Sequence, residues 1–325
     1  MSESSNQPPQ SKASKLRQLY RDHAPVVSPG VYDGYSAMMV QAMGFKSAAT
    51  TGAGLSNSVL GVPDIGLFSL RDNIDACRRI ASSVSIPIMA DADTGYGNAV
   101  TVYHVVQYFE EAGVVGINIE DQLMPKRCGH MRGKELVEPR EMVKKIEAAI
   151  KAKKDPDFII NARTDAIAVE GIEGTVARIR EYVAAGADMI YADAFRDEDD
   201  IRRVIDAARG VPVNVNMGFG IRSRPTSPSI SMARLKELGV TRVSLPRMLP
   251  AAALMGMQKA LEVMRECIET GKLVDRPDLL VGMETITGLM GYEQLSQLEN
   301  DLLPDEELER KYQSASRDYV VKKGV

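Results

Sequence analysis

Two aspartates stand two positions apart in the segment DADTGYG, residues 91–97. On a β-strand, residues i and i+2 share a face, so the carboxylates of Asp91 and Asp93 are expected to point the same way. Mg²⁺ prefers such hard oxygen ligands and keeps several waters, so it needs few protein side chains. Aspartates also cap helices, and for Asp93 alone a cap explains the residue equally well. The pair therefore indicates a magnesium site only in combination with further acids.

A basic segment, PKRCGH at residues 125–130, holds one of the three cysteines and one of the three histidines. A single cysteine and a single histidine lack the second ligand pair of a zinc site, and no second cysteine is near enough for a redox pair. An acid–base thiol fits better, because basic neighbours stabilise the thiolate of Cys128. These neighbours are Lys126, Arg127 and His130. The alternative is a loop cysteine beside solvated charges.

Two further segments have residue types suited to binding an anion. The glycine-rich stretch TTGAGLSNSVLGVPD, residues 50–64, lets backbone N–H groups approach a carboxylate or a phosphate, although such loops also arise for steric reasons. Arg163, in INARTD, carries a guanidinium suited to bidentate carboxylate binding. An ion pair of Arg163 with Glu120 or Asp193 is the structural alternative, and both roles are compatible.

Eight short, apolar, β-rich runs must position these residues. The runs are nearly continuous in hydrophobicity, which is typical of parallel strands covered on both faces. They span residues 26–33, 46–52, 86–93, 114–121, 157–165, 188–195, 211–218 and 240–246. Segments long enough for crossover helices separate them, so the sequence predicts a (β/α)₈ barrel. A doubly wound sheet is the alternative, but no glycine-rich phosphate fingerprint follows the first run.

Polar side chains gather where these runs end. They are Asp91, Asp93, Glu120, Asp121, Arg163, Asp165, Asp193 and Asn216. In a barrel, the carboxyl ends of all strands open into one mouth, which is where barrel enzymes keep their chemistry. A purely structural protein has little reason to place so many charges at the ends of buried strands. The pattern therefore predicts an enzyme.

The composition of the chain bears on its binding partners and on its cellular location. The 325-residue chain has a net charge of −4, so no basic surface predicts nucleic-acid binding, and no apolar run is long enough for a membrane span. Three cysteines cannot form a full disulfide framework, which favours a reducing cytoplasmic location. We expect a disordered tail over residues 1–14, the barrel over 15–250, and helices over 251–325. These last helices carry enough Met and Leu to pack on a partner subunit or, alternatively, on their own barrel.

Five segments taken together resemble the isocitrate lyase/phosphoenolpyruvate mutase superfamily, over roughly residues 15–300. They are TGAGLSNSVLGVPD, DADTGYG, GINIEDQ, PKRCGH and NARTDA. The resemblance implies a (β/α)₈ barrel, bound Mg²⁺ or Mn²⁺, and a small 2-hydroxy or 2-oxo di- or tricarboxylate substrate. It also implies a homotetramer in which the C-terminal helix is swapped between subunits. PKRCGH points to the carbon–carbon lyase branch, although carboxyphosphonoenolpyruvate mutases are similar to this sequence as well.

The resemblance implies a role for each matching residue. Asp91 corresponds to the main metal ligand, and Asp64, Asp93 and Glu120 correspond to ligands through water. Residues implied in substrate binding are Thr51, Gly52, Ala53, Arg127, Gly129, Arg163, Asp193 and Asn216. Cys128 corresponds to the catalytic acid, supported by Lys126 and His130.

Two departures from the family pattern bear on the substrate. Asp193 stands where glutamate is usual, and Ala251 stands where methylisocitrate lyases carry an arginine, for which Arg247 or Arg222 could substitute. A missing arginine argues against a tricarboxylate and favours a smaller acid, such as an alkylmalate or oxaloacetate. The predicted reaction is cleavage of a C–C bond to a 2-oxo acid and a carboxylate. The alternatives are oxaloacetate hydrolysis or decarboxylation, a phosphonomutase reaction, and dicarboxylate binding without catalysis.

Overall fold

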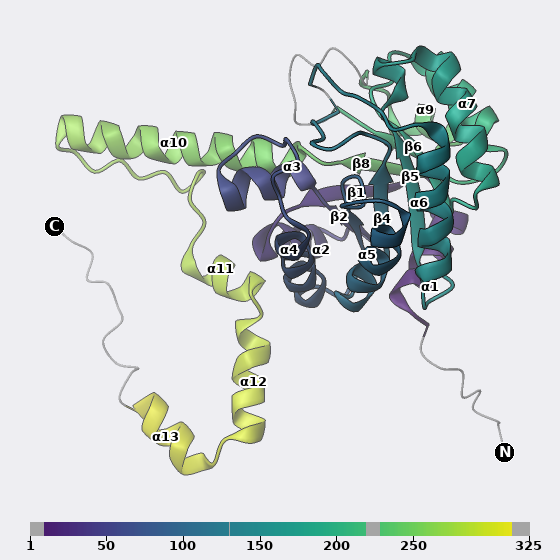
Figure 1. Cartoon of the computed structure of the whole chain (residues 1–325). Helices are drawn as coiled ribbons and strands as arrows, with labels where there is room; N and C mark the ends of the chain where they lie inside the picture. Colours follow the sequence, from purple (N-terminus) through teal and green to yellow (C-terminus); the bar gives the residue numbers. More distant parts are fainter. Residues whose placement is uncertain (1–9, 130, 219–227, 314–325) are drawn as a thin grey trace, which may run out of the picture. The chain divides into compact units, whose positions relative to one another are not determined.

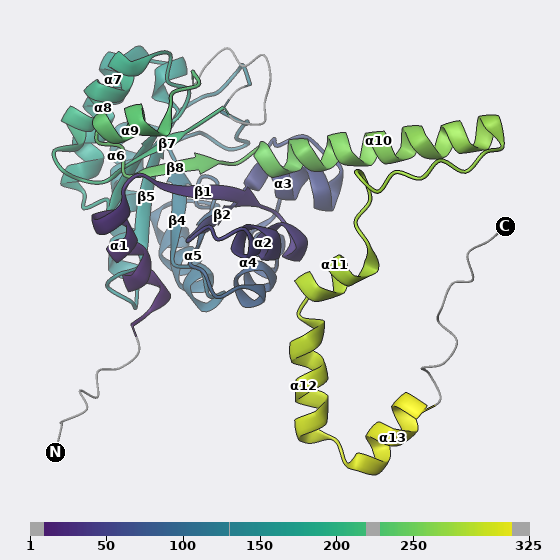
Figure 2. The same cartoon turned by 180° about the vertical axis from the view of Figure 1, so that it is seen from behind.

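Eight parallel strands close into a barrel in this computed structural model, which describes residues 10–129, 131–218 and 228–313 (Figures 1 and 2). The strands pair in sequence order, and β1 pairs with β8 to complete the ring. They are β1 (Val26–Val31), β2 (Ala48–Thr50), β3 (Ile88–Asp91), β4 (Gly116–Glu120), β5 (Ile159–Thr164), β6 (Met189–Ala192), β7 (Val213–Asn216) and β8 (Arg242–Leu245). Each strand lies inside one of the predicted apolar runs. The predicted barrel is therefore confirmed, and a doubly wound sheet is excluded.

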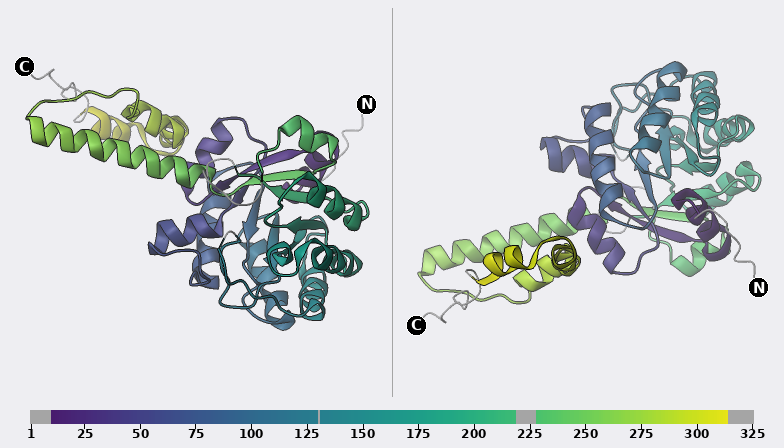
Figure 3. Two further views of the ribbon diagram at one scale, coloured as in Figure 1. Left: turned by 90° about the horizontal axis from the view of Figure 1, so that it is seen from above. Right: turned by 90° about the horizontal axis from the view of Figure 1, so that it is seen from below.

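Helices between the strands cover the outside of the barrel (Figure 3). They are α2 (Gly34–Ala42), α4 (Leu70–Ser83), α5 (Ala99–Glu111), α6 (Pro139–Ala152), α7 (Gly171–Ala184), α8 (Glu198–Ala208) and α9 (Met232–Glu237). Three short helices directly follow β2 and β5: α3 (Gly52–Leu55), the π-helix η1 (Ser56–Leu60) and the 3₁₀-helix η2 (Ala166–Ala168). The helix α5 shows why the covering helices form. Asn98 caps its first turn, and a buried stripe at helical spacing faces the strands, formed by Val102, Val105, Val106 and Phe109.

The helix α1 (Lys12–His23) packs at the amino-terminal ends of the strands. Its buried Leu16 and Tyr20 belong to one apolar cluster with Met89 and Met189, from β3 and β6. α1 begins inside the segment 1–14, for which the sequence predicts a tail. Apolar packing at this end leaves the opposite, carboxyl-terminal end of the barrel for polar side chains.

The helices that follow β8 are α10 (Met248–Thr270), α11 (Met283–Leu289), α12 (Tyr292–Leu302) and α13 (Asp305–Gln313). The chain divides into two compact units, Met1–Gln258 and Lys259–Val325. The predicted boundary after residue 250 falls inside α10, which is continuous there and contains no buried residue. Within the described parts of the chain, no helix is both long enough and apolar enough to cross a membrane.

Candidate active site

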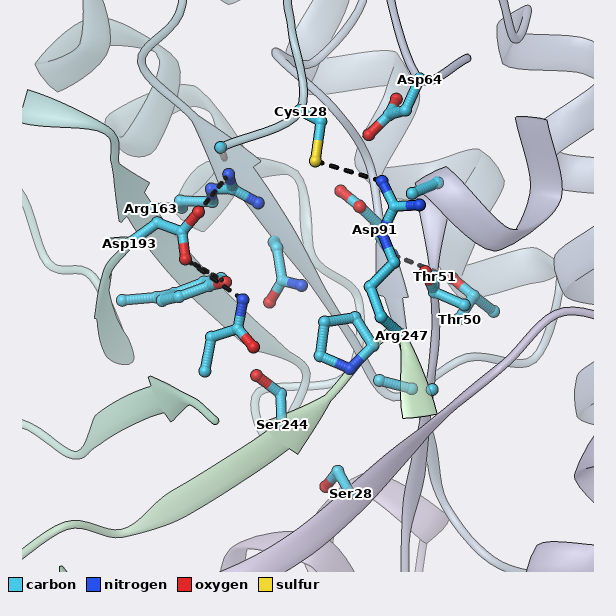
Figure 4. A pocket seen from close by; sticks show the side chains of 18 of the residues that line it. Ser28, Thr50, Thr51, Asp64, Asp91, Cys128, Arg163, Asp193, Ser244 and Arg247 are labelled. Atoms are coloured by element: carbon cyan, nitrogen blue, oxygen red, sulfur yellow. Dashed lines mark hydrogen bonds and ion pairs between the residues drawn. The ribbon is translucent and has the colours of Figure 1, made fainter. Parts of the chain in front are cut away.

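A cavity lies at the carboxyl ends of the strands, where the sequence predicts the barrel mouth (Figure 4). The predicted residues that line it are Thr51, Ala53, Asp64, Asp91, Cys128, Gly129, Arg163, Asp193 and Asn216. Four others, Gly52, Asp93, Glu120 and Lys126, are buried beside these residues. Side chains from six different strands or the loops after them thus meet at one place, as the strand-end pattern predicts. His130 and Arg222 lie outside the described residues.

A buried lysine joins two of the predicted metal ligands. Nζ of Lys126 lies 2.7 Å from Oδ1 of Asp64 and 2.8 Å from Oδ1 of Asp93, and the side chain of Lys126 is only 3 % exposed. Burial raises the pKa of Asp93 to about 6, even though the Lys126 ammonium opposes the shift. Burial by itself favours a neutral Lys126, but the surrounding carboxylates, with Asp93 first, raise its pKa well above the ordinary value. The positive charge of Lys126 therefore offsets the negative charges of the carboxylates that surround it.

The capping explanation for the two aspartates fails, because Asn98 caps the following helix, α5. Asp91 instead ends β3 with its carboxylate held by backbone donors. Oδ2 accepts a hydrogen bond from the N–H of Gly52 at 3.2 Å, and Oδ1 accepts one from the N–H of Asp93 at 3.2 Å. A Cβ at Gly52 would stand 2.8 Å from Oδ2 of Asp91, so this close approach requires glycine. The carboxylate of Asp91 is thus fixed at the cavity wall.

The acids around Asp91 fit a divalent cation held mostly through water. Glu120 is buried, its Oε1 accepts no hydrogen bond from any described residue, and burial raises its pKa well above the ordinary value. An acceptor of this kind is suited to a cation or to its water shell. Among the described residues, no three His, Cys, Asp or Glu side chains converge closely enough to ligate one ion directly. This arrangement suits Mg²⁺ with one direct carboxylate, Asp91, and water in the remaining positions.

The guanidinium of Arg163 is surrounded by carboxylates. Its Nε lies 2.9 Å from Oδ2 of Asp165 and 3.2 Å from Oε2 of Glu120. Its Nη2 lies 3.1 Å from Oδ2 of Asp193, so both ion pairs considered as the structural alternative are present. The Tyr191 ring stacks 5.0 Å from the guanidinium carbon, and its hydroxyl donates to Asp193 at 3.1 Å. Nη1 makes no hydrogen bond to a described residue, which leaves it available to a ligand in the cavity.

The Cys128 thiol faces the cavity, where the guanidinium of Arg247 contacts it (Figure 4). Nη2 of Arg247 donates to Sγ of Cys128 at 3.2 Å, while Nη1 donates to Oδ1 of Asn57 at 3.3 Å. The backbone N–H of Cys128 donates to the Asp64 carbonyl at 3.1 Å, which ties the loop to the residues after η1. Arg127 is exposed and does not line the cavity, so the geometry does not support its predicted contact with substrate.

Several residues of the cavity were missed by sequence reasoning. Besides Tyr191, they are Asn118, from the middle of β4, and Arg242 and Ser244, from β8. A polar residue within an apolar run was not recognised as a site residue, because the sequence pattern marks where a strand ends and not which residues within the strand face the cavity. The sequence does indicate that Arg247 lies at the mouth, because it directly follows the eighth apolar run, but it does not indicate the contact of Arg247 with the thiol.

The sequence is similar to a family model and to enzymes of known activity. The family model described as phosphoenolpyruvate phosphomutase matches residues 16–265. A 2,3-dimethylmalate lyase from Eubacterium barkeri is 36 % identical over 289 residues, covering 89 % of this chain and 97 % of the relative. A 2-methylisocitrate lyase from Shewanella oneidensis is 36 % identical over 284 residues, covering 87 % and 93 %.

Solved structures of related enzymes superpose on most of the chain. Oxaloacetate acetylhydrolase in complex with 3,3-difluorooxalacetate matches with a TM-score of 0.82 and 31 % identity, over 91 % of this chain and 98 % of that chain. A phosphonopyruvate hydrolase complex with oxalate and Mg²⁺ matches with a TM-score of 0.78 and 31 % identity, over 90 % and 100 %. On this family match, with the barrel and its mouth residues, the chain belongs to the phosphoenolpyruvate mutase/isocitrate lyase superfamily.

Proposed function

We propose that this protein is a Mg²⁺-dependent lyase that cleaves a C–C bond of a 2-hydroxy di- or tricarboxylate, of the alkylmalate or 2-methylisocitrate type. The products are a 2-oxo acid and a second carboxylate. The observation that carries the proposal is that a thiol, a carboxylate and a guanidinium line one cavity, through Cys128, Asp91 and Arg163. The relatives named as dimethylmalate lyase and methylisocitrate lyase support the same reaction class.

The residues of the cavity have distinct tasks in this reaction. Arg163, held by its acids at Nε and Nη2, presents Nη1 to a substrate carboxylate. A basic group of the cavity takes the proton of the 2-hydroxyl group, and the C2–C3 bond breaks, so that C2 becomes a carbonyl and the electron pair passes to C3. The thiol of Cys128 then donates its proton to C3 and leaves a thiolate. Arg247 stabilises that thiolate at 3.2 Å.

The proposal includes a bound Mg²⁺ because the carboxylates at the barrel mouth are suited to hold a divalent cation and its waters. Asp91 would ligate Mg²⁺, or Mn²⁺ in its place, and Asp64, Asp93 and Glu120 would hold its waters. When bound, the cation supplies positive charge for the oxygen that becomes the carbonyl. The phosphonopyruvate hydrolase complex that superposes on this chain contains Mg²⁺, which supports the assignment.

Hydrolysis of oxaloacetate is the second candidate, because oxaloacetate acetylhydrolase superposes with a TM-score of 0.82. One experiment separates the candidates. The protein is incubated with Mg²⁺ and, separately, with 2-methylisocitrate, dimethylmalate, oxaloacetate and phosphonopyruvate, and the products are identified by NMR. We expect a 2-oxo acid from an alkylmalate. Oxalate and acetate from oxaloacetate alone would instead establish the hydrolase, and a change confined to phosphonopyruvate would indicate phosphorus chemistry.

Assembly and location are part of the same proposal. The helix α10 exposes six large apolar side chains, Leu254, Met255, Met257, Leu261, Met264 and Ile268. We infer that partner subunits cover them in a homotetramer, which light scattering of the purified protein tests. Dispersed monomers at micromolar concentration would contradict the inference. The three cysteines are free in the structure, which supports a reducing, cytoplasmic location.

A further inference from the structure

The loop that carries Cys128 is closed at its base. Gln122 and Leu136 form an antiparallel bridge, and the N–H of Leu123 donates to the carbonyl of Glu135 at 2.8 Å. The side-chain amide of Gln122 also bonds both the N–H and the carbonyl of Arg127, at 2.9 Å each. The outgoing limb of the loop is therefore fixed by Gln122.

The returning limb is fixed by a buried ammonium, that of Lys134. Its side chain is 3 % exposed, and its Nζ donates to the carbonyl of Gly129 and to Oδ1 of Asp165, the latter at 3.2 Å. Gly129 directly follows Cys128. Asp165 in turn holds Arg163, accepting from its Nε at 2.9 Å and from its Nη2 at 3.1 Å. One ammonium thus connects the thiol-bearing loop with the carboxylate that orients the cavity arginine.

The same contact holds the loop backbone against the cavity wall. A Cβ at Gly129 would stand 1.7 Å from Oδ2 of Asp193 and 2.7 Å from Nη2 of Arg163, so the backbone lies directly on this ion pair. A buried ammonium is costly unless strong acceptors surround it. The acceptors of Lys134 are the carbonyl of the loop and the carboxylate behind the arginine.

We propose that Lys134 is a positioning residue that fixes the Cys128 thiol relative to Arg163. The proposal rests on the proposed function for the role of the thiol as proton donor. Proton transfer requires the donor within hydrogen-bond reach of the reacting carbon, and a misplacement of about 1 Å costs on the order of 100-fold in rate. Lys134 acts through Gly129 and Asp165 and need not touch the substrate.

The test compares Lys134→Met with a matched control, Lys153→Met. Nζ of Lys153 also bridges a carbonyl and a carboxylate, at 3.1 Å from Phe158 O and 3.0 Å from Oδ2 of Asp188, but these residues stand at the opposite, amino-terminal side of the strands. Methionine keeps the length of the side chain. Asp165 keeps its two bonds from Arg163 in the Lys134 variant, so its carboxylate still has a cationic partner.

Two measurements are made on each variant: turnover of the dicarboxylate that the wild type cleaves, and the rate at which iodoacetamide labels Cys128, followed by peptide mass spectrometry. We expect Lys134→Met to lower kcat roughly 10- to 100-fold and to speed labelling severalfold. Lys134→Arg should fall between it and the wild type, and Lys153→Met should change neither quantity. If Lys134→Met does not fold, Lys134→Gln, which keeps a donor for the Gly129 carbonyl, takes its place in both measurements.

Lys134 variants that match Lys153→Met in turnover and in labelling would overturn the proposal. The rate of labelling can be measured whether or not the protein catalyses the cleavage of a dicarboxylate. If the wild type cleaves none of the dicarboxylates, the proposed lyase function fails, and faster labelling of the Lys134 variant still supports the positioning role. Unchanged labelling in that case rejects the positioning role as well.

Discussion

Nη2 of Arg247 lies 3.2 Å from Sγ of Cys128, although 119 positions separate the two residues in the chain. Arg247 follows β8 and Cys128 lies in the loop after β4, so the contact crosses the mouth of the barrel (Figure 4). A guanidinium favours a thiolate over a thiol. The contact therefore supplies a partner for the charge that remains on sulfur after the thiol has given up its proton.

Replacing this arginine tests whether the contact matters for turnover. A hydrogen bond to a charged group contributes about 1.5 to 3 kcal/mol, so Arg247→Met should lower kcat roughly 10- to 100-fold. Arg247→Lys should retain more activity, because it keeps the charge. The matched control is Arg203→Met on the outer helix α8, where Arg203 pairs with Glu173. Equal steady-state kinetics for the Arg247 and Arg203 variants would refute the role.

Cys128→Ser tests the thiol itself. A serine hydroxyl is a much weaker acid, so loss of general acid catalysis should cut turnover by about 10² to 10⁴. Mg²⁺-dependent binding of oxalate, measured by calorimetry, should be largely retained, since Asp91 and Arg163 are untouched. Cys267→Ser serves as the control, because Cys267 lies in α10. Wild-type turnover by Cys128→Ser would rule out the acid role and favour hydrolysis.

Removing the proposed direct metal ligand should abolish the response to magnesium. Binding of Mg²⁺ to the folded state alone stabilises the protein by about 2.7 kcal/mol at 100 times Kd, which appears as a higher Tm. Asp91→Ala should lose most of this increase. Asp75→Ala is the control, because Asp75 is partly exposed and pairs with Arg78 on the outer helix α4. An identical magnesium-induced shift in wild type and Asp91→Ala would place the ion elsewhere.

Gly129 is a position where one methyl group should be harmful. Because its Cβ would stand 1.7 Å from Oδ2 of Asp193, Gly129→Ala must push the loop away from the wall. We expect turnover to fall at least 10-fold, since the displaced thiol no longer reaches its carbon. Gly34→Ala, where nothing lies within 4 Å of the new Cβ, should leave kinetics unchanged. The prediction fails if the two variants have the same kcat.

The buried thiol of Cys77 gives a prediction about pH. Burial raises the pKa of Cys77 to about 12, from an ordinary value of 9.0. The unfolded chain therefore releases this proton first as pH rises, so the stability contribution is intact below pH 9 and is lost between about 9 and 12. Tm of the wild type should fall more steeply above pH 9 than that of Cys77→Ala. Parallel pH profiles of the two proteins would contradict the assignment.

The strands and the mouth could be predicted because they depend on local patterns. Continuous apolar runs identify buried parallel strands, and the polar residue that ends each run marks the mouth; Asp91 and Arg163 both lie at the cavity for this reason. The same reasoning predicted that the basic neighbours of Cys128 stabilise its thiolate. The structure instead pairs Lys126 with Asp64 and Asp93, because buried carboxylates bind an ammonium more strongly than a thiol does.

Contacts between distant loops were not predictable from spacing. The Arg247 contact joins the residues after β8 to the loop after β4, and the apolar runs do not show which of these segments meet across the mouth. The polar interior was missed for a related reason. Arg242 begins β8 inside an apolar run, yet its side chain is fully buried and its Nε donates to Ser28 at 3.2 Å. Such a residue is recognised only once its neighbours are known.

The bridge between Gln122 and Leu136 also bears on how this barrel can acquire new substrates. Because the two ends of the loop are joined to each other, the loop leaves and returns to the barrel at one place and forms a cassette with a single base. Exchange of this cassette between relatives should alter the groups that meet the substrate without disturbing strand register. Recombination at these two positions is therefore a route to altered specificity, both in natural divergence and in laboratory engineering.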